Sequence, residues 1–123
     1  MNFAIKILIV CIAIEHFYIL WFEMFAWTTK GKKVFKNFPE HLFEETKTLA
    51  ANQGLYNGFL AAGLIWSLCI QNTEWSNNVS LFFLSCVAVA GMYGALTASK
   101  RIFIVQALPA LITIGLIVFN SFI

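Results

Sequence analysis

The chain has 123 residues, of which 60% are hydrophobic and only 11% are charged, and its formal net charge is +2 at pH 7. Ordinary soluble domains carry about 25% charged residues. The low charged fraction, together with a mean hydropathy of +0.79, therefore excludes an ordinary soluble domain. The basic residues form short clusters without an aromatic stripe between them, so the composition also argues against a nucleic-acid partner.

Four long apolar segments account for the high hydropathy. They cover about residues 3–27, 52–70, 79–97 and 102–122. Each is close to the ~20 residues with which a helix crosses about 30 Å of hydrocarbon. We therefore expect an all-α, integral membrane bundle of four transmembrane helices that forms a single domain over residues 1–123.

The first segment contains three ionisable residues, Glu15, His16 and Glu23. Such groups cost about 2.5–3.5 kcal/mol at the centre of a membrane helix, so they usually face protein or water. On an ideal helix His16 and Glu23 lie within about 20° of one face, with Leu20 and Trp27 on the same stripe. We take these three as candidate catalytic residues, with His16 as the acid or base and Glu15 or Glu23 as its carboxylate partner.

The only long connection, residues 28–51, follows the first segment. Pro39 suits the first turn of a helix, which could continue unbroken into the second segment. Phe35, Phe38 and Phe43 would let this connection lie on the membrane surface. Its basic residues are Lys30, Lys32, Lys33, Lys36 and Lys47.

Small residues recur every four positions at the start of the second segment, at Ala50, Gly54, Gly58 and Ala62. Such a ridge lets another helix approach closely, either within the chain or in a homo-oligomer, which we expect here. Gly91 continues this pattern in the third segment. In the fourth, Pro109 should kink the helix and free a carbonyl group.

Loop charges predict the orientation in the membrane. The long first connection and the Lys100–Arg101 pair are basic, whereas the 71–78 turn carries only Glu74. By the positive-inside rule both basic loops are cytoplasmic and both termini lie outside. The lysines of the first connection would meet anionic lipid headgroups, so membrane lipids are expected partners.

Under this topology, polar residues from four helices gather in the cytoplasmic half of the bundle, while the outer halves of the last three spans are nearly all apolar. The expected ligand contacts are Gln53, Tyr56, Asn57, Tyr93 and Gln106. They predict a cytoplasm-facing pocket for a small amphipathic or lipid-like molecule, with acid/base chemistry as an added possibility. The alternatives are a structural network of polar contacts, an assembly protein, and proton-coupled transport with Glu15 as the proton site. The cysteines and histidines lack metal-ligand spacing, and we expect neither a metal nor another cofactor.

Four sequence segments resemble the same protein family. They are IEHFYILWFEMFAWTT at residues 14–29, FEETKTLAANQGLYNGFLAAG at 43–63, CVAVAGMYGALTASK at 86–100 and VQALPA at 105–110. In this order they resemble a small bacterial membrane family known as domain of unknown function 1304. The resemblance implies a four-helix protein of the bacterial cytoplasmic membrane, without an assigned activity. Small multidrug exporters also place a glutamate inside the first of four helices, as Glu15 is placed here.

Overall fold

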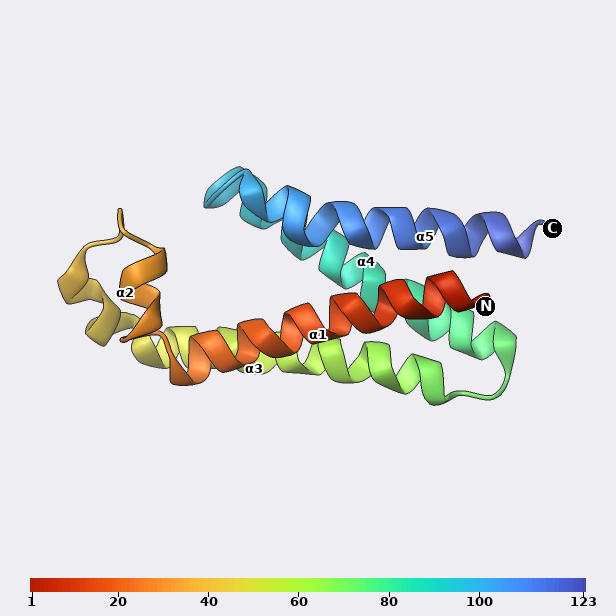
Figure 1. Cartoon of the computed structure of the whole chain (residues 1–123), viewed down its shortest axis with the longest axis horizontal. Coiled ribbons are helices and arrows are strands. Elements are labelled where there is room, and N and C mark those ends of the chain that lie inside the picture. The colour runs from red at the N-terminus through yellow and green to blue at the C-terminus, as the bar shows by residue number, and fades with distance from the viewer. The chain divides into compact units, whose positions relative to one another are not determined.

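The computed structural model describes residues 1–123, and every regular element in it is a helix (Figure 1). The elements are α1 (Phe3–Phe25), α2 (Lys30–Val34), α3 (Glu40–Cys69), α4 (Thr73–Thr97), the π-helix η1 (Phe103–Ala107) and α5 (Leu108–Ser121). The all-α class is therefore confirmed. Three helical segments are long and apolar enough to cross a membrane, namely Phe3–Phe25, Thr73–Thr97 and Phe103–Ser121.

Helix α3 differs from the predicted second span. It runs for 30 residues from Glu40 to Cys69, which confirms a helix that starts just after Pro39 and continues without a break. Its first turns are charged, and Asn52, Gln53 and Asn57 lie among its apolar residues. These side chains lower its hydropathy, so composition gives three clear spans where we expected four.

The chain divides into two compact units. The larger contains residues 1–13 and 62–123, and the smaller contains residues 14–61. Helices α1 and α3 each contribute residues to both units. Whether the two units form one domain is not decided by this division, so the single domain over residues 1–123 stays a prediction.

In the larger unit, α3 and α4 are joined by a connection of only three residues, Ile70 to Asn72. Asn72 caps α4, since its Oδ1 accepts a hydrogen bond from the Trp75 N–H at 3.0 Å. Helix α4 thus begins at Thr73, and the predicted 71–78 turn is wrong in extent. The polar residues that indicated a loop belong instead to the first turns of the helix.

Three buried serines link the end of α3 to the start of α4. The Ser76 hydroxyl donates to the Ser67 carbonyl, and the Ser80 and Ser67 hydroxyls are hydrogen-bonded, both at 2.8 Å. The Ser67 hydroxyl also donates to the Leu64 carbonyl at 2.6 Å. Hydroxyl groups thus hold this hairpin together, although the outer halves of these helices were expected to be nearly all apolar.

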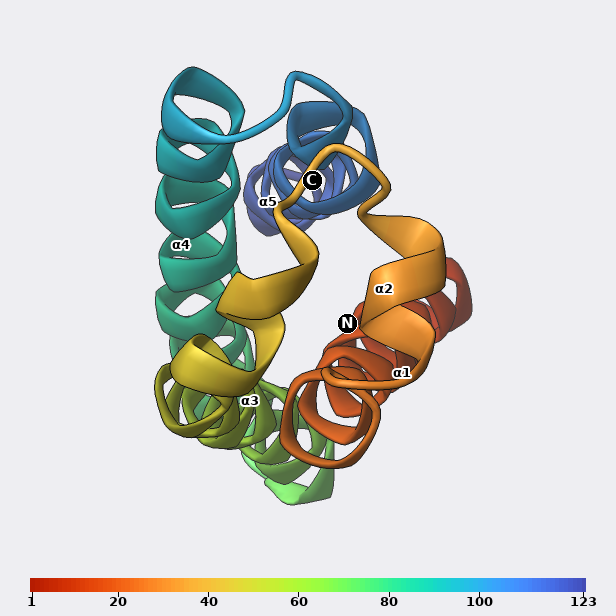
Figure 2. The same ribbon diagram turned by 90° about the vertical axis from the view of Figure 1, so that its left-hand side faces the viewer.

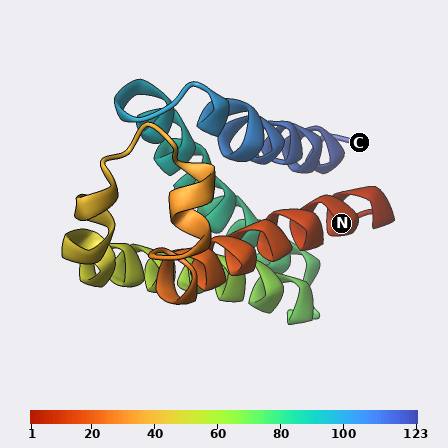
Figure 3. The same ribbon diagram turned by 60° about the vertical axis from the view of Figure 1, so that its left-hand side comes forward.

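Pro109 lies directly after a widened helical turn. In η1 the helix takes π geometry, and the Leu108 N–H donates to the Phe103 carbonyl five residues earlier. Pro109 lacks an N–H and its ring crowds the preceding turn, so a π turn here relieves both problems. Figure 3 shows α4 and α5 as neighbours joined through this region. A Cβ on Gly91 of α4 would stand 2.7 Å from the Ala107 nitrogen, which confirms Gly91 as a close-packing position.

In the smaller unit, α3 packs against the second half of α1 through glycines. A Cβ on Gly54 would stand 3.0 Å from the Leu20 carbonyl oxygen, and one on Gly58 only 2.3 Å from Leu20 Cδ1. The ridge is thus confirmed at Gly54 and Gly58, and it faces α1 of the same chain. Ala62 is exposed, whereas Ala61 is buried, because a four-residue repeat drifts off the face of a helix with 3.6 residues per turn.

Aromatic residues of the first connection pack on the end of α1. The Trp27 and Phe43 rings are 5.2 Å apart, and the Phe38 and Phe43 rings are 4.9 Å apart. Trp27 Nε1 also donates to Thr46 Oγ1 at 3.0 Å. Phe43 is fully buried, which differs from the membrane-surface position expected for it. Figure 2 shows α2 and the first turns of α3 on either side of the loop that joins them.

Candidate functional site

The three candidate catalytic residues all lie in the smaller unit, on α1. His16 is 1% exposed, whereas Glu15 and Glu23 are partly buried. One carboxylate oxygen of each glutamate, Oε1 of Glu15 and Oε2 of Glu23, is buried without a hydrogen-bond partner. Buried carboxylate oxygens are normally paired, so both glutamates retain acceptor capacity.

Glu23 lies directly against α3. Its Cβ would be 3.0 Å from a Cβ at position 54, so the absence of a side chain on Gly54 gives Glu23 its room between the helices. The Asn57 side chain is a hydrogen-bonding neighbour of the Glu23 carboxylate. Asn57 Nδ2 also donates to the Gln53 carbonyl oxygen at 3.0 Å. The structure thus brings Glu23 and Asn57 together.

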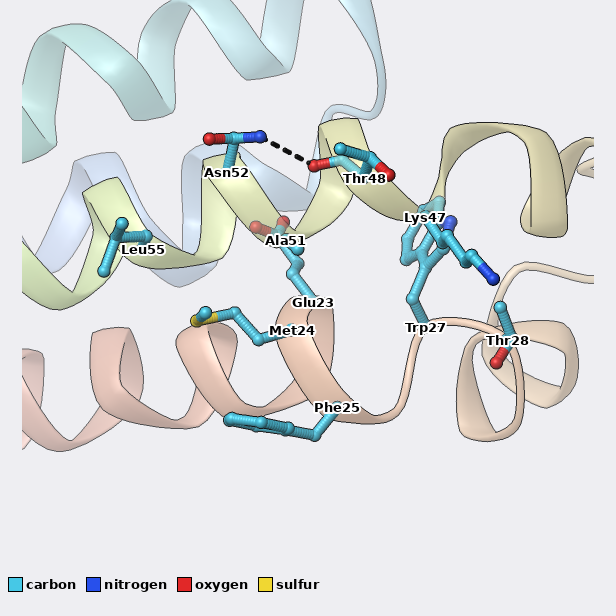
Figure 4. A pocket seen from close by; sticks show the side chains of 10 residues that line it. All are labelled: Glu23, Met24, Phe25, Trp27, Thr28, Lys47, Thr48, Ala51, Asn52 and Leu55. Atoms are coloured by element: carbon cyan, nitrogen blue, oxygen red, sulfur yellow. Dashed lines mark hydrogen bonds between the residues drawn. The ribbon is translucent and has the colours of Figure 1, made fainter.

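An open groove of about 380 Å³ lies beside Glu23, between the end of α1 and α3 (Figure 4). From α1 and the turn after it, the groove is lined by Glu23, Met24, Phe25, Trp27 and Thr28; from α3, by Lys47, Thr48, Ala51, Asn52 and Leu55. A carboxylate, an ammonium group, hydroxyls and an amide therefore share the groove with aromatic and aliphatic side chains. This combination suits a molecule with a polar head and an apolar tail.

Local hydrogen bonds fix the α3 side of this groove. Asn52 Nδ2 donates to the Thr48 carbonyl oxygen at 2.9 Å. Lys47 pairs with Glu44 one turn earlier, and its hydrogen bond and positive charge lower the pKa of the Glu44 carboxyl. No group of three or more His, Cys, Asp or Glu side chains is placed to hold a metal ion.

A second groove, of about 420 Å³, lies elsewhere on α3 and shares Trp27 and Asn52 with the first. Gln53 and Tyr56, two of the expected ligand contacts, line this second groove. Tyr56 is 64% exposed. The structure therefore separates these two residues from the groove beside Glu23.

The remaining candidates lie outside both grooves. Glu15, His16 and Asn57 line neither. Tyr93 and Gln106 belong to the larger unit, where Tyr93 is 69% exposed and Gln106 lies in η1. The single pocket proposed from sequence, formed by all eight residues, stays a prediction.

Of the residues that line the Glu23 groove, sequence reasoning selected only Glu23 itself, and the polar or aromatic residues that it missed include Trp27, Lys47, Thr48 and Asn52. Trp27 was placed on the Glu23 stripe but not considered as a site residue, and Lys47 was used to orient the chain and as a contact of lipid headgroups. A helical pattern could have identified two of them, because Thr48, Asn52 and Leu55 recur with the spacing of one helix face.

Comparison with known proteins decides the family. A family model described as a protein of unknown function (DUF1304) matches residues 10–118. The chain belongs to this family. It is 36% identical over 102 residues to the uncharacterized protein YpaA of Lactococcus lactis subsp. lactis (strain IL1403), a match that covers 81% of this chain and 84% of the relative. No solved structure matches. The resemblance found in the sequence is thus confirmed, and since neither description names an activity, function has to be argued from the site.

Proposed function

We propose that this DUF1304 protein binds a small amphipathic molecule in the groove between the end of α1 and α3. The observation that carries the proposal is the Glu23 carboxylate, with one oxygen buried and unpaired, beside a groove with apolar walls. An unpaired buried acceptor is unfavourable until a donor reaches it. A ligand with a hydroxyl or amine in its head group would supply that donor once a rotation of the Glu23 side chain turns this oxygen toward the groove.

The two charged groups of the groove define the head group further. Glu23 favours a cationic or hydrogen-bond-donating group, and Lys47, which has N–H donors beyond the one it gives to Glu44, favours an acceptor or anion. A zwitterionic head satisfies both residues at once. The tail would lie against Trp27 and Leu55, and the groove volume of about 380 Å³ falls within the roughly 300–1,000 Å³ of ligand sites.

Any acid/base chemistry in this groove would begin at Glu23, the only candidate catalytic residue that lines it. His16 is about 10 Å along α1 from Glu23, and His16 and Glu15 line neither groove and take no part in this proposal. Proton-coupled transport through Glu15 and a purely structural role are the competing functions, and both predict that the groove retains no ligand.

We further propose that α3 crosses the membrane as a fourth span, which places both termini outside and the first connection in the cytoplasm. The support is the position of the basic loops. The lysines between α1 and α3 and the Lys100–Arg101 pair are separated in the chain by α3 and α4. Only if both helices cross do the two basic loops share one side, as the positive-inside rule requires. At 1.5 Å per residue, α3 is about 45 Å long, which exceeds the roughly 30 Å of hydrocarbon.

Retention of lysophosphatidylethanolamine tests the proposed groove. This probe has an ammonium group for Glu23, a phosphate for Lys47 and one acyl chain. We expect native mass spectrometry of the detergent-solubilised protein to show one bound molecule. Glu23→Gln should weaken retention about tenfold or more, as loss of a charged hydrogen bond does.

Glu45→Gln is the matched control, because Glu45 is exposed on α3 and lines neither groove. Retention in this variant should equal that of the unmodified chain. Equal retention in the Glu23 and Glu45 variants, or none in the unmodified chain, would refute ligand binding at this groove.

A further inference from the structure

The short helix α2 concentrates positive charge at the end of α1. Lys30, Lys32 and Lys33 lie in α2, Lys36 follows it, and all four are exposed. Lys32 is paired with Glu40 at 3.7 Å, whereas the other three make no ion pair. The corner between α1 and α2 therefore carries uncompensated positive charge.

This charge sits on a fixed turn. The Gly31 N–H donates to the Ala26 carbonyl oxygen at 2.9 Å, which anchors α2 to the residue after α1. Gly31 is buried, and a Cβ there would stand 3.2 Å from the Phe43 ring. Figure 3 shows α2 next to the end of α1. Packing on both sides thus holds the lysines in place.

Lys30 points back along α1. Its Nζ lies 5.3 Å from the centre of the Tyr18 ring and 5.5 Å from that of Trp21. These two rings are 5.8 Å apart and about half exposed. Tyr and Trp near the end of a span occupy the headgroup level of a membrane. Tyr18 is about 10 Å along the helix from Phe25, where α1 ends. Under the proposed topology the Lys30 ammonium group therefore lies near the cytoplasmic end of the first span, on the side of α1 that carries exposed rings.

An ammonium group near the end of a membrane span is stabilised by a nearby anion. The contact with two exposed rings is a weak cation–π interaction, and a charge beside hydrocarbon is unfavourable unless it is paired or reaches water. The phosphate of an anionic phospholipid occupies the same level and has the opposite charge.

The exposed face of α1 continues from Lys30 toward the membrane interior. Ile14, Phe17 and Trp21 recur with helical spacing, and their exposed fractions are 61%, 45% and 45%. Together they form an apolar strip that begins at the aromatic pair under Lys30. An acyl chain lying on this strip has its phosphate end at the ammonium group.

We propose that the α1–α2 corner is a binding site for one anionic phospholipid, with its phosphate at Lys30 and an acyl chain along Ile14, Phe17 and Trp21. The site is distinct from the groove beside Glu23, since Lys30, Tyr18 and Trp21 do not line that groove. In this site Lys30 binds the lipid phosphate, and Ile14, Phe17 and Trp21 contact the acyl chain.

Selective retention of phosphatidylglycerol over phosphatidylcholine tests the site. The full chain is reconstituted in nanodiscs containing both lipids, released into the mass spectrometer, and scored for bound lipid. We expect one phosphatidylglycerol per chain. Lys30→Gln should lower its retention about tenfold or more, because a charge-assisted contact is lost. Trp21→Leu keeps the apolar strip but removes a ring, and should lower retention about twofold to fivefold.

Lys36→Gln is the matched control, because it removes one exposed lysine of the same connection that contacts neither ring. Its retention should fall about fivefold at most, as for any charge near an anionic surface. Retention of lysophosphatidylethanolamine in the Glu23 groove should be unchanged by Lys30→Gln, which keeps the two sites separate. Equal losses in the Lys30 and Lys36 variants would overturn the proposal in favour of diffuse attraction. Equal retention of the two phospholipids would overturn it as well.

Discussion

Gly91→Ala tests the packing of α4 on the π turn. The new Cβ would stand 2.7 Å from the Ala107 nitrogen and 3.0 Å from the Ala107 Cβ. Ala107 is fully buried and ends η1. Its nitrogen is backbone, so the clash cannot be relieved by a side-chain rotation. The helices must move apart, or the π turn must change its hydrogen bonding.

Gly115→Ala in α5 is the matched control, because a Cβ there would meet nothing within 4 Å. The difference in unfolding free energy between the two variants therefore isolates the cost of the clash at position 91. Both variants gain the helix propensity of alanine over glycine, about 0.5–1 kcal/mol. Only the first adds overpacking, which typically costs about 1–3 kcal/mol. We therefore expect Gly91→Ala to be less stable than Gly115→Ala by about 1–3 kcal/mol.

The free energy of unfolding is measured by titration with sodium dodecyl sulfate in a mild detergent, with helix content followed by circular dichroism. The two variants are compared with each other and with the unmodified chain. Equal unfolding free energies for the two variants would refute close contact between Gly91 and the η1 backbone. A gain in stability for Gly91→Ala would do the same.

Two further predictions address the hairpin and the topology. Ser80→Ala removes a buried hydrogen bond to Ser67 and should lower the free energy of unfolding by about 0.5–1.5 kcal/mol. Ser85→Ala is the control, because Ser85 is exposed and its replacement should not change the free energy of unfolding. Equal effects of the two substitutions in the same titration would argue against the serine network. Alkaline phosphatase, which is active only outside the cytoplasm, should be active when fused at Ile123, and a tag at Met1 should be cleaved by protease added to intact cells. An inactive fusion with a cleavable tag would show an odd number of crossings and exclude α3 as a span.

The helices were predictable because each apolar segment is long and continuous. The errors arose where polar residues serve the interior of the protein. Ser76 and Asn77 looked like loop residues, yet they belong to α4, and Ser76 is buried on the Ser67 carbonyl. Polarity alone cannot distinguish a solvated turn from a hydroxyl network inside a hairpin. The π turn before Pro109 shows the same limit, since the proline predicts a distortion but not its geometry.

The site was predictable to a smaller extent. Spacing placed Glu23 and Trp27 on one stripe of the first predicted span; α1 ends at Phe25, so Trp27 lies in the turn after it, and both residues line the groove against α3. The pattern could not say which residues of α3 would meet them, because spacing describes a single helix while a site depends on the register between two. That register is set by Gly54 and Gly58, which fit around Leu20. It brings Asn57 to Glu23 and leaves Tyr56 exposed.

The low hydropathy of α3 and the groove beside it have one physical cause. The polar residues that lower the hydropathy of α3 also lie at its grooves, since Asn52 lines both grooves, Gln53 lines one and Asn57 adjoins Glu23. A helix facing only lipid would lose stability from such side chains. Asn57 has a partner in Glu23 of α1, and the Asn52 amide bonds the Thr48 carbonyl oxygen of its own helix. Asn52, one of the polar residues that lower the hydropathy of α3, is thus also a residue that both grooves share.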